Sequence, residues 1–159
     1  MKERSLPHDR STPRRKFCLA VTCIGCLVIG LAGCGRGPET VPVTGKVLYN
    51  GQPLPFGSVT FQPPSGQPAR GEIRADGTFE LSTFRRGDGA VVGKHKVKIA
   101  CYESQNPAAV KGPGEQSLGR LLIPTHYTLL DQSGLTADVQ RENKAPLLFD
   151  LTGPAASFR

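Results

Sequence analysis

Alternation of apolar and polar side chains, interrupted by glycine and proline, is the feature that most constrains how this chain folds. In residues 94–101, His95 and three apolar residues alternate with lysines, so the two kinds of side chain face opposite sides of an extended strand. The same period of two recurs across residues 41–153, where no stretch has the apolar spacing of a long amphipathic helix. Asn50-Gly51 and Asp76-Gly77 are typical of hairpin turns, because a type I′ turn needs a positive φ at both central positions.

Seven short strands are expected from this pattern. Their spacing of roughly 8–15 residues predicts an all-β domain, a seven-stranded antiparallel Greek-key β-sandwich. Residues 103–120 have no clear periodicity, and a loop of this length is either mobile or functional. The last two strands are joined by a turn around Glu142-Asn143-Lys144. The strands are expected within 41–50, 58–63, 71–75, 78–82, 94–102, 135–139 and 147–151.

The N-terminal region has the pattern of an export signal. Residues 2–16 are polar and basic, and the uncharged apolar run Phe17–Leu31 is shorter than the about 20 residues of a membrane span. The run ends in Leu31-Ala32-Gly33-Cys34, which resembles the bacterial lipobox. The resemblance implies cleavage between Gly33 and Cys34 and a diacylglycerol on the Cys34 thiol. A signal anchor and a signal without lipid are the alternatives, and Arg14-Arg15 leaves general or twin-arginine export open.

This signal divides the chain and locates it. We expect a signal peptide over 1–33, a flexible tether over 34–40, a β-sandwich over 41–153 and a C-terminal tail over 154–159. The protein would then be a membrane-anchored lipoprotein outside the cytoplasm, with the outer membrane favoured because Gly35 is not a retention aspartate. Of the net charge of +7, the signal carries +4, from six basic and two acidic residues. The remainder is only mildly basic, which argues against a nucleic-acid partner.

Only one cysteine remains for the mature domain. Cys18, Cys23 and Cys26 lie in the apolar signal, so no disulfide can form around Cys101. Cys101 shares its face with two aliphatic residues, which predicts a buried thiol rather than a reactive one. The lysines at 94, 96 and 98 are interpreted as the solvated face of an outer strand, where they discourage edge pairing, with a ligand-binding stripe as the alternative.

No catalytic, cofactor or metal site can be assigned from the residue pattern. His95 and His126 are the histidines of the mature chain, and they lack a metal-binding spacing. Asp76, Asp88 and Asp131 stand in turns that contain Gly or Ser, and they lack the repeated spacing of metal-binding oxygen ligands. Turn formation accounts for Asp76. Carbohydrate-binding sites often use exposed aromatic residues, and this chain has three tyrosines and no tryptophan. The tyrosines are Tyr49, Tyr102 and Tyr127.

Several segments together resemble the carboxypeptidase regulatory-like domain, a transthyretin-like sandwich of the immunoglobulin or prealbumin type. They are Val43-Thr44-Gly45-Lys46-Val47, Gly51-Gln52-Pro53-Leu54, Val59-Thr60-Phe61 and Ala75-Asp76-Gly77-Thr78-Phe79-Glu80-Leu81. The closing residues are similar to small bacterial lipoproteins built on that module. They are Ile123-Pro124, Tyr127, Ser133-Gly134-Leu135-Thr136, Val139 and Phe149-Asp150-Leu151.

The resemblance implies a non-enzymatic envelope module that presents its sandwich to a protein or polysaccharide. Two alternatives stay open. One is a small transthyretin-like hydrolase, although the chain ends Ser157-Phe158-Arg159 instead of the Tyr-Arg-Gly-Ser terminus of the purine-pathway hydrolase of that fold. The other is a module that binds calcium or carbohydrate. A shared fold does not by itself decide among these functions.

Overall fold

The computed structural model describes residues 38–159 except 110–116, 143–144, 155 and 159, and this part of the chain is all-β. Two short 3-10 helices, η2 (Glu103–Gln105) and η3 (Thr125–Thr128), lie between the eighth and ninth strands. The ten strands are β1 (Thr40–Val41), β2 (Thr44–Tyr49), β3 (Gln52–Pro53), β4 (Gly57–Gln62), β5 (Ala69–Ile73), β6 (Thr78–Glu80), β7 (Ala90–Val91), β8 (Gly93–Ala100), β9 (Leu135–Val139) and β10 (Leu147–Leu151).

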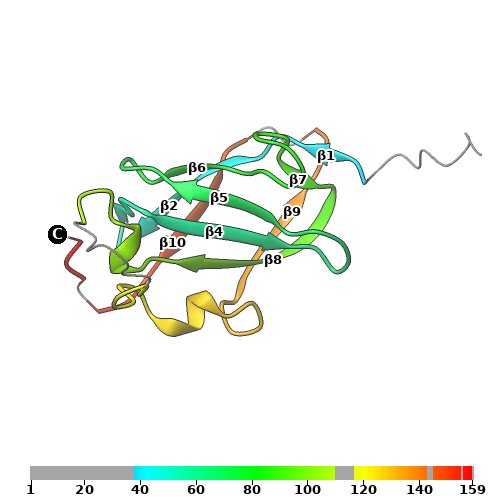
Figure 1. The fold of residues 1–159 in the computed structure, drawn as a ribbon. Coiled ribbons are helices and arrows are strands. Elements are labelled where there is room, and N and C mark those ends of the chain that lie inside the picture. The colour runs from blue at the N-terminus through cyan, green and yellow to red at the C-terminus, as the bar shows by residue number, and fades with distance from the viewer. Residues whose placement is uncertain (1–37, 110–116, 143–144, 155, 159) are drawn as a thin grey trace, which may run out of the picture. The chain divides into compact units, whose positions relative to one another are not determined.

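The strands form three sheets (Figure 1). One four-stranded sheet has the order β5-β4-β8-β9 and is antiparallel throughout. The other has β10, β2 and β3 in order, with β6 also paired to β2, and β1 and β7 make a two-stranded ladder. The pairing of β10 with β2 is parallel, so the expectation of a wholly antiparallel arrangement is wrong at this ladder. Alternation within a strand indicates which face is buried, but it carries no information about the direction of the partner.

Each of the seven expected ranges overlaps a strand, with β5 beginning two residues earlier than expected, and three further strands of two residues bring the number to ten. The additional strands β1, β3 and β7 are too short to show alternation. Thr40, the last residue of the range expected to be a tether, pairs with Val91 in the β1–β7 ladder. The hairpin at Asn50-Gly51 is confirmed, because both residues have a positive φ, 52° and 77°, and β2 pairs with β3 directly across them.

Asp76-Gly77 forms the expected hairpin turn, because Arg70 on β5 and Ser82 just after β6 pair in an antiparallel bridge on its two sides. The turn is closed by two backbone hydrogen bonds, from Gly77 N to Arg74 O and from Arg74 N to Thr78 O, each 2.8 Å. However, β5 pairs with β4, whereas β6 pairs with β2 in the other sheet. The turn therefore carries the chain from one sheet to the other. A side chain at Gly77, where φ is +83°, would collide with the carbonyl oxygen of Val47.

The hydrophobic core lies between the two four-stranded sheets. Phe61 on β4 contacts Phe79 on β6 and Phe149 on β10, with ring centroids 6.2 and 5.9 Å apart. Phe79 and Phe149 stack on each other at 6.3 Å. Because one ring comes from one sheet and two come from the other, these contacts hold the sheets face to face in a sandwich-like arrangement.

Residues after β10 pack against the domain, although the sequence pattern gave them only as a tail. The Phe158 ring meets Tyr49 and Phe56 edge to face, with centroids 5.8 and 6.1 Å apart. The Tyr49 hydroxyl donates a hydrogen bond of 2.6 Å to the carbonyl oxygen of Pro154. The C-terminal segment is thus fixed to the end of the sandwich that carries the β2–β3 hairpin.

The long loop expected over 103–120 is closed at its two ends. Glu103 N donates to Arg120 O at 3.0 Å, and Tyr102 pairs with Leu121 in an isolated bridge. An ion pair of 3.1 Å between the Arg120 and Glu103 side chains adds to this closure. Residues 110–116 of the loop lie outside the described part of the chain.

Candidate functional site

The predicted lipidation and cleavage site, Cys34 with Gly33, lies outside the described residues, as does the whole expected signal peptide. The prediction of a lipid anchor therefore stays a prediction. Among the residues that the structure describes, no helix has the length and apolar character needed to cross a membrane.

Cys101 is fully buried at the end of the core face of β8, and its thiol is free. Burial raises the pKa of the thiol to about 12. A thiol reacts as the thiolate, so this environment suppresses its reactivity at neutral pH. The prediction that Cys101 is buried is confirmed, and its low reactivity stays a prediction.

The two histidines lie in different surroundings. His95 faces the core from β8 and is 3% exposed, and its ring lies 5.9 Å from that of Phe61. Its Nε2 is 2.7 Å from the carbonyl oxygen of Val91, while Nδ1 has no partner among the described residues. His126 is exposed on η3 and packs its ring on Tyr127 at 4.0 Å. Neither ring has a carboxylate partner among the described residues.

The three turn acids have separate structural roles. Asp76 accepts hydrogen bonds from the backbone and hydroxyl of Thr78, which lower its pKa, so its role in the turn is confirmed. Asp131 pairs with Lys96 at 2.7 Å, and that hydrogen bond and charge lower its pKa. Asp88 accepts from three successive backbone N–H groups, those of residues 83, 84 and 85. No three of the His, Cys, Asp and Glu side chains described here are grouped closely enough to hold a metal ion.

The lysines of β8 lie on the solvent face of a central strand. Lys94 and Lys96 are exposed, and Lys98 is half-buried. β8 is hydrogen-bonded to β4 on one edge and β9 on the other, so the interpretation that the lysines protect an outer strand from edge pairing is wrong. Sequence parity gives the face of a strand but not its position in the sheet. These lysines are therefore available for another role.

Arg70 extends this positive surface to a third strand. In the sheet register Arg70 on β5 lies opposite Thr60 on β4, and Thr60 lies opposite Lys98 on β8. Residues opposite one another in a sheet point to the same face. We call the four cations of this face, Arg70, Lys94, Lys96 and Lys98, the basic sheet face.

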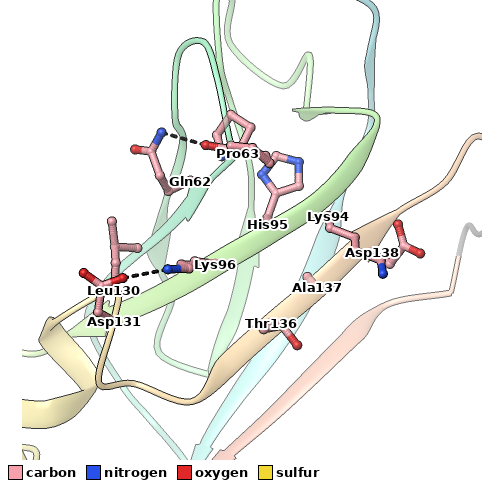
Figure 2. A pocket seen from close by; sticks show the side chains of 11 residues that line it. Gln62, Pro63, Lys94, His95, Lys96, Leu130, Asp131, Thr136, Ala137 and Asp138 are labelled. Atoms are coloured by element: carbon pink, nitrogen blue, oxygen red, sulfur yellow. Dashed lines mark hydrogen bonds and ion pairs between the residues drawn. The ribbon is translucent and has the colours of Figure 1, made fainter.

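Two adjacent hollows lie over the basic sheet face. The first, of about 850 Å³, is lined by Lys94, Lys96, the Pro63-Pro64 loop and Asp131, and we call it the proline groove (Figure 2). Figure 2 shows Lys96 reaching across to Asp131, while Lys94 lies beside Asp138 on the neighbouring strand.

The second hollow, of about 600 Å³, is lined by Thr60, Arg70, Lys98, Tyr102 and the 128–130 segment, and we call it the tyrosine groove. Gln62 and Leu130 line both grooves, so the two are adjacent. Of the three tyrosines considered for carbohydrate, Tyr49 and Tyr127 are buried in the core, whereas Tyr102 is half-buried and lines this groove.

Several residues of these grooves were not identified from the sequence. Arg70 was missed because the short strand was expected to begin at Gly71, which left Arg70 in the preceding loop. The segment 128–131 begins at the last residue of η3 and carries no alternation, so nothing in its pattern places it beside β8. The parity of Arg70 with Glu72 would have indicated its outward face once the strand was extended by two residues.

Comparisons of the chain with protein-family models, with curated proteins and with solved structures find no match.

Proposed function

We propose that this protein is a lipid-anchored cell-envelope protein whose β domain is a non-catalytic recognition module, and that the basic sheet face binds an anionic polymer of the envelope. The observation that carries this proposal is the row of lysines on β8. They lie beside two grooves on a strand that is paired on both edges. The need to prevent edge pairing therefore does not explain why lysines occur there.

The spacing of the cations fits a polymer better than a single small ion. Alternate residues of a strand lie about 6.6 Å apart, so the three lysines of β8 form a linear series of charges. A series of this kind can meet repeated negative charges of a chain and gives binding that weakens as salt increases. The Lys96–Asp131 pair does not prevent this, because both side chains are well exposed, 61% and 84%, and such pairs are weak.

The resemblance to the carboxypeptidase regulatory-like domain and the finer fold are part of the proposal. The seven strands of three or more residues overlap the expected ranges, which supports a Greek-key sandwich of the immunoglobulin or prealbumin type with three short strands added.

The anchor is tested by the mass of the N-terminal peptide of protein purified from membranes. We expect a peptide that begins at an acylated Cys34, and we expect a Cys34→Ser variant to carry no acyl chain and to keep residues 1–33. An unmodified peptide from the first residues would overturn the anchor and the envelope location together.

Recognition is tested with the full chain in neutral detergent and two matched polymers, dextran sulfate and uncharged dextran. We expect binding to dextran sulfate alone, and weaker binding by the single variants Lys94→Gln and Lys96→Gln. The matched control is Lys46→Gln on β2 of the other sheet, which should bind normally. An equal loss in the control, or binding to anionic vesicles but not to dextran sulfate, would contradict the proposal. Turnover of ester, amide or ureide substrates would contradict its non-catalytic part.

A further inference from the structure

We propose that the tyrosine groove is a subsite for a sugar unit that carries a carboxylate, held between Arg70 and Lys98 with its ring against Tyr102. This inference rests on the proposed function, because it names the ligand class and the place where the basic sheet face would bind it. Three observations support it: the register of β5, β4 and β8, the absence of side-chain partners for Arg70 and Lys98 among the described residues, and the presence of both polar and apolar residues in the groove.

The sheet register places one cation on each side of the Thr60 hydroxyl. Arg70, Thr60 and Lys98 form one row across β5, β4 and β8. Neighbouring strands are about 4.8 Å apart, so the backbones of the two cationic residues are separated by about 10 Å. Both side chains are long enough to meet over the central threonine. A carboxylate there can accept from the guanidinium, the ammonium and the hydroxyl together.

Both cations of this row are available for a ligand. Neither the Arg70 nor the Lys98 side chain has a hydrogen-bond or ion-pair partner among the described residues. Lys96, two residues along the same face, is by contrast engaged by Asp131. An anion in the tyrosine groove would therefore not have to displace an internal carboxylate, whereas one in the proline groove would.

The rest of the lining suits a sugar rather than a bare anion. Gln62 Nε2 donates to Pro63 O at 3.1 Å, and the Thr128 hydroxyl donates to Thr125 O at 2.7 Å. The amide oxygen of Gln62 and the hydroxyl oxygen of Thr128 therefore remain as acceptors for sugar hydroxyl groups. Tyr102 and Leu129 supply apolar surface for the carbon face of a pyranose ring, and Leu129 is 43% exposed although it is aliphatic. A volume of about 600 Å³ lies within the usual range of small-molecule sites. Polar groups on one side and apolar groups on the other match the two-sided character of a pyranose.

The test uses the full chain in neutral detergent and a pair of oligosaccharides that differ only in charge. The probes are oligogalacturonate and its methyl ester, in which each carboxylate is masked. We expect the acid to bind and the ester to bind at least about tenfold more weakly, since a charge-assisted contact contributes about 1.5–3 kcal/mol. Arg70→Gln and Lys98→Gln should each lower the affinity for oligogalacturonate about tenfold. Lys98→Arg, which keeps the charge, should restore most of the affinity.

Lys46→Gln is the matched control, because it removes the same charge from a strand of the other sheet, outside the basic sheet face and both grooves. We expect it to change the affinity for oligogalacturonate by less than about threefold, in keeping with a screened surface charge. Melting temperatures of all variants verify that they are folded, and Lys98→Arg still tests the site if a glutamine variant is not.

The outcomes separate this inference from the proposed function. If Lys94→Gln weakens binding as much as Lys98→Gln, the basic sheet face stands and the subsite is overturned. If the chain binds dextran sulfate or single-stranded DNA but not oligogalacturonate, the sugar class is overturned while anion binding stands. If it binds no polyanion, both proposals fall.

Discussion

Replacing Asp88 by Asn tests how the chain between β6 and β7 is held. The carboxylate accepts from Thr83 N at 2.7 Å and from the N–H groups of Phe84 and Arg85 at 2.9 Å. An asparagine has one acceptor oxygen, so it can face either Thr83 or the other pair. If the asparagine oxygen accepts from Phe84 N and Arg85 N, the asparagine NH2 group faces the Thr83 N–H and no hydrogen bond forms there. The two remaining hydrogen bonds are weaker because their acceptor is no longer charged.

The magnitude follows from the surroundings of each donor. Thr83 is 9% exposed, so water replaces the lost bond poorly, and a charge-assisted bond contributes about 1.5–3 kcal/mol. Phe84 is 49% exposed, which allows water to offset part of the weakening there, and we assign about 0.5 kcal/mol to each of the two remaining bonds. Asp88→Asn should therefore lower the free energy of unfolding by about 3 kcal/mol at pH 7.

The effect should depend on pH in a defined direction. Burial opposes ionisation of Asp88, but the three backbone N–H groups outweigh it and hold its pKa below the ordinary 3.8. A lowered pKa in the folded state stabilises the fold fully above the unfolded value, and this stabilisation is lost as pH falls through the folded pKa. The difference between wild type and Asp88→Asn should thus be largest at neutral pH and shrink near pH 3.

The assay is urea denaturation followed by circular dichroism at pH 7 and pH 3, with Asp76→Asn as the control. Asp76 uses one oxygen for both of its bonds to Thr78, so an asparagine can keep them and the change should be small. Equal midpoints for Asp88→Asn and wild type at pH 7 would refute the reasoning. A difference that grows toward pH 3 would refute the assigned direction of the pKa.

Three further changes test other parts of the structure. Phe158→Ala should lower the free energy of unfolding by about 2 kcal/mol in thermal or urea melts, whereas Phe84→Ala should not; equal effects would contradict C-terminal packing. Cys101, followed by mass spectrometry in the tryptic peptide 99–111, should react with maleimide only in denaturant, and rapid native labelling would contradict its burial. Asp131→Asn releases Lys96, so dextran sulfate should bind more tightly at an unchanged melting temperature; weaker binding would exclude competition by Asp131.

Local pattern predicted what each strand buries, and tertiary pairing decided the rest. The alternation over 94–101 correctly placed Cys101 and His95 in the core and the lysines outside. It could not show that β8 is central, because position in a sheet depends on which distant strands pair with it. The Asp76-Gly77 turn was found for the same local reason, while the transfer of β6 to the other sheet depends on its pairing with β2.

The candidate site was only half visible in the sequence. The lysines stand out because they are periodic, whereas Arg70 and the 128–130 segment reach the groove through sheet register and through the path of η3. Tyr102 was one of three equivalent tyrosines until burial separated it from the other two. Residues that gather from four segments leave no common signature along the chain.

The parallel β2–β10 ladder has a mechanical consequence. Five residue pairs join the two strands, and because they run in the same direction, the chain enters β2 at one end of the ladder and leaves β10 at the other. Tension between the N-terminal and C-terminal sides of the domain therefore acts along the ladder and loads its hydrogen bonds together instead of opening them one after another. A domain pulled from its two ends would therefore resist in shear along this ladder.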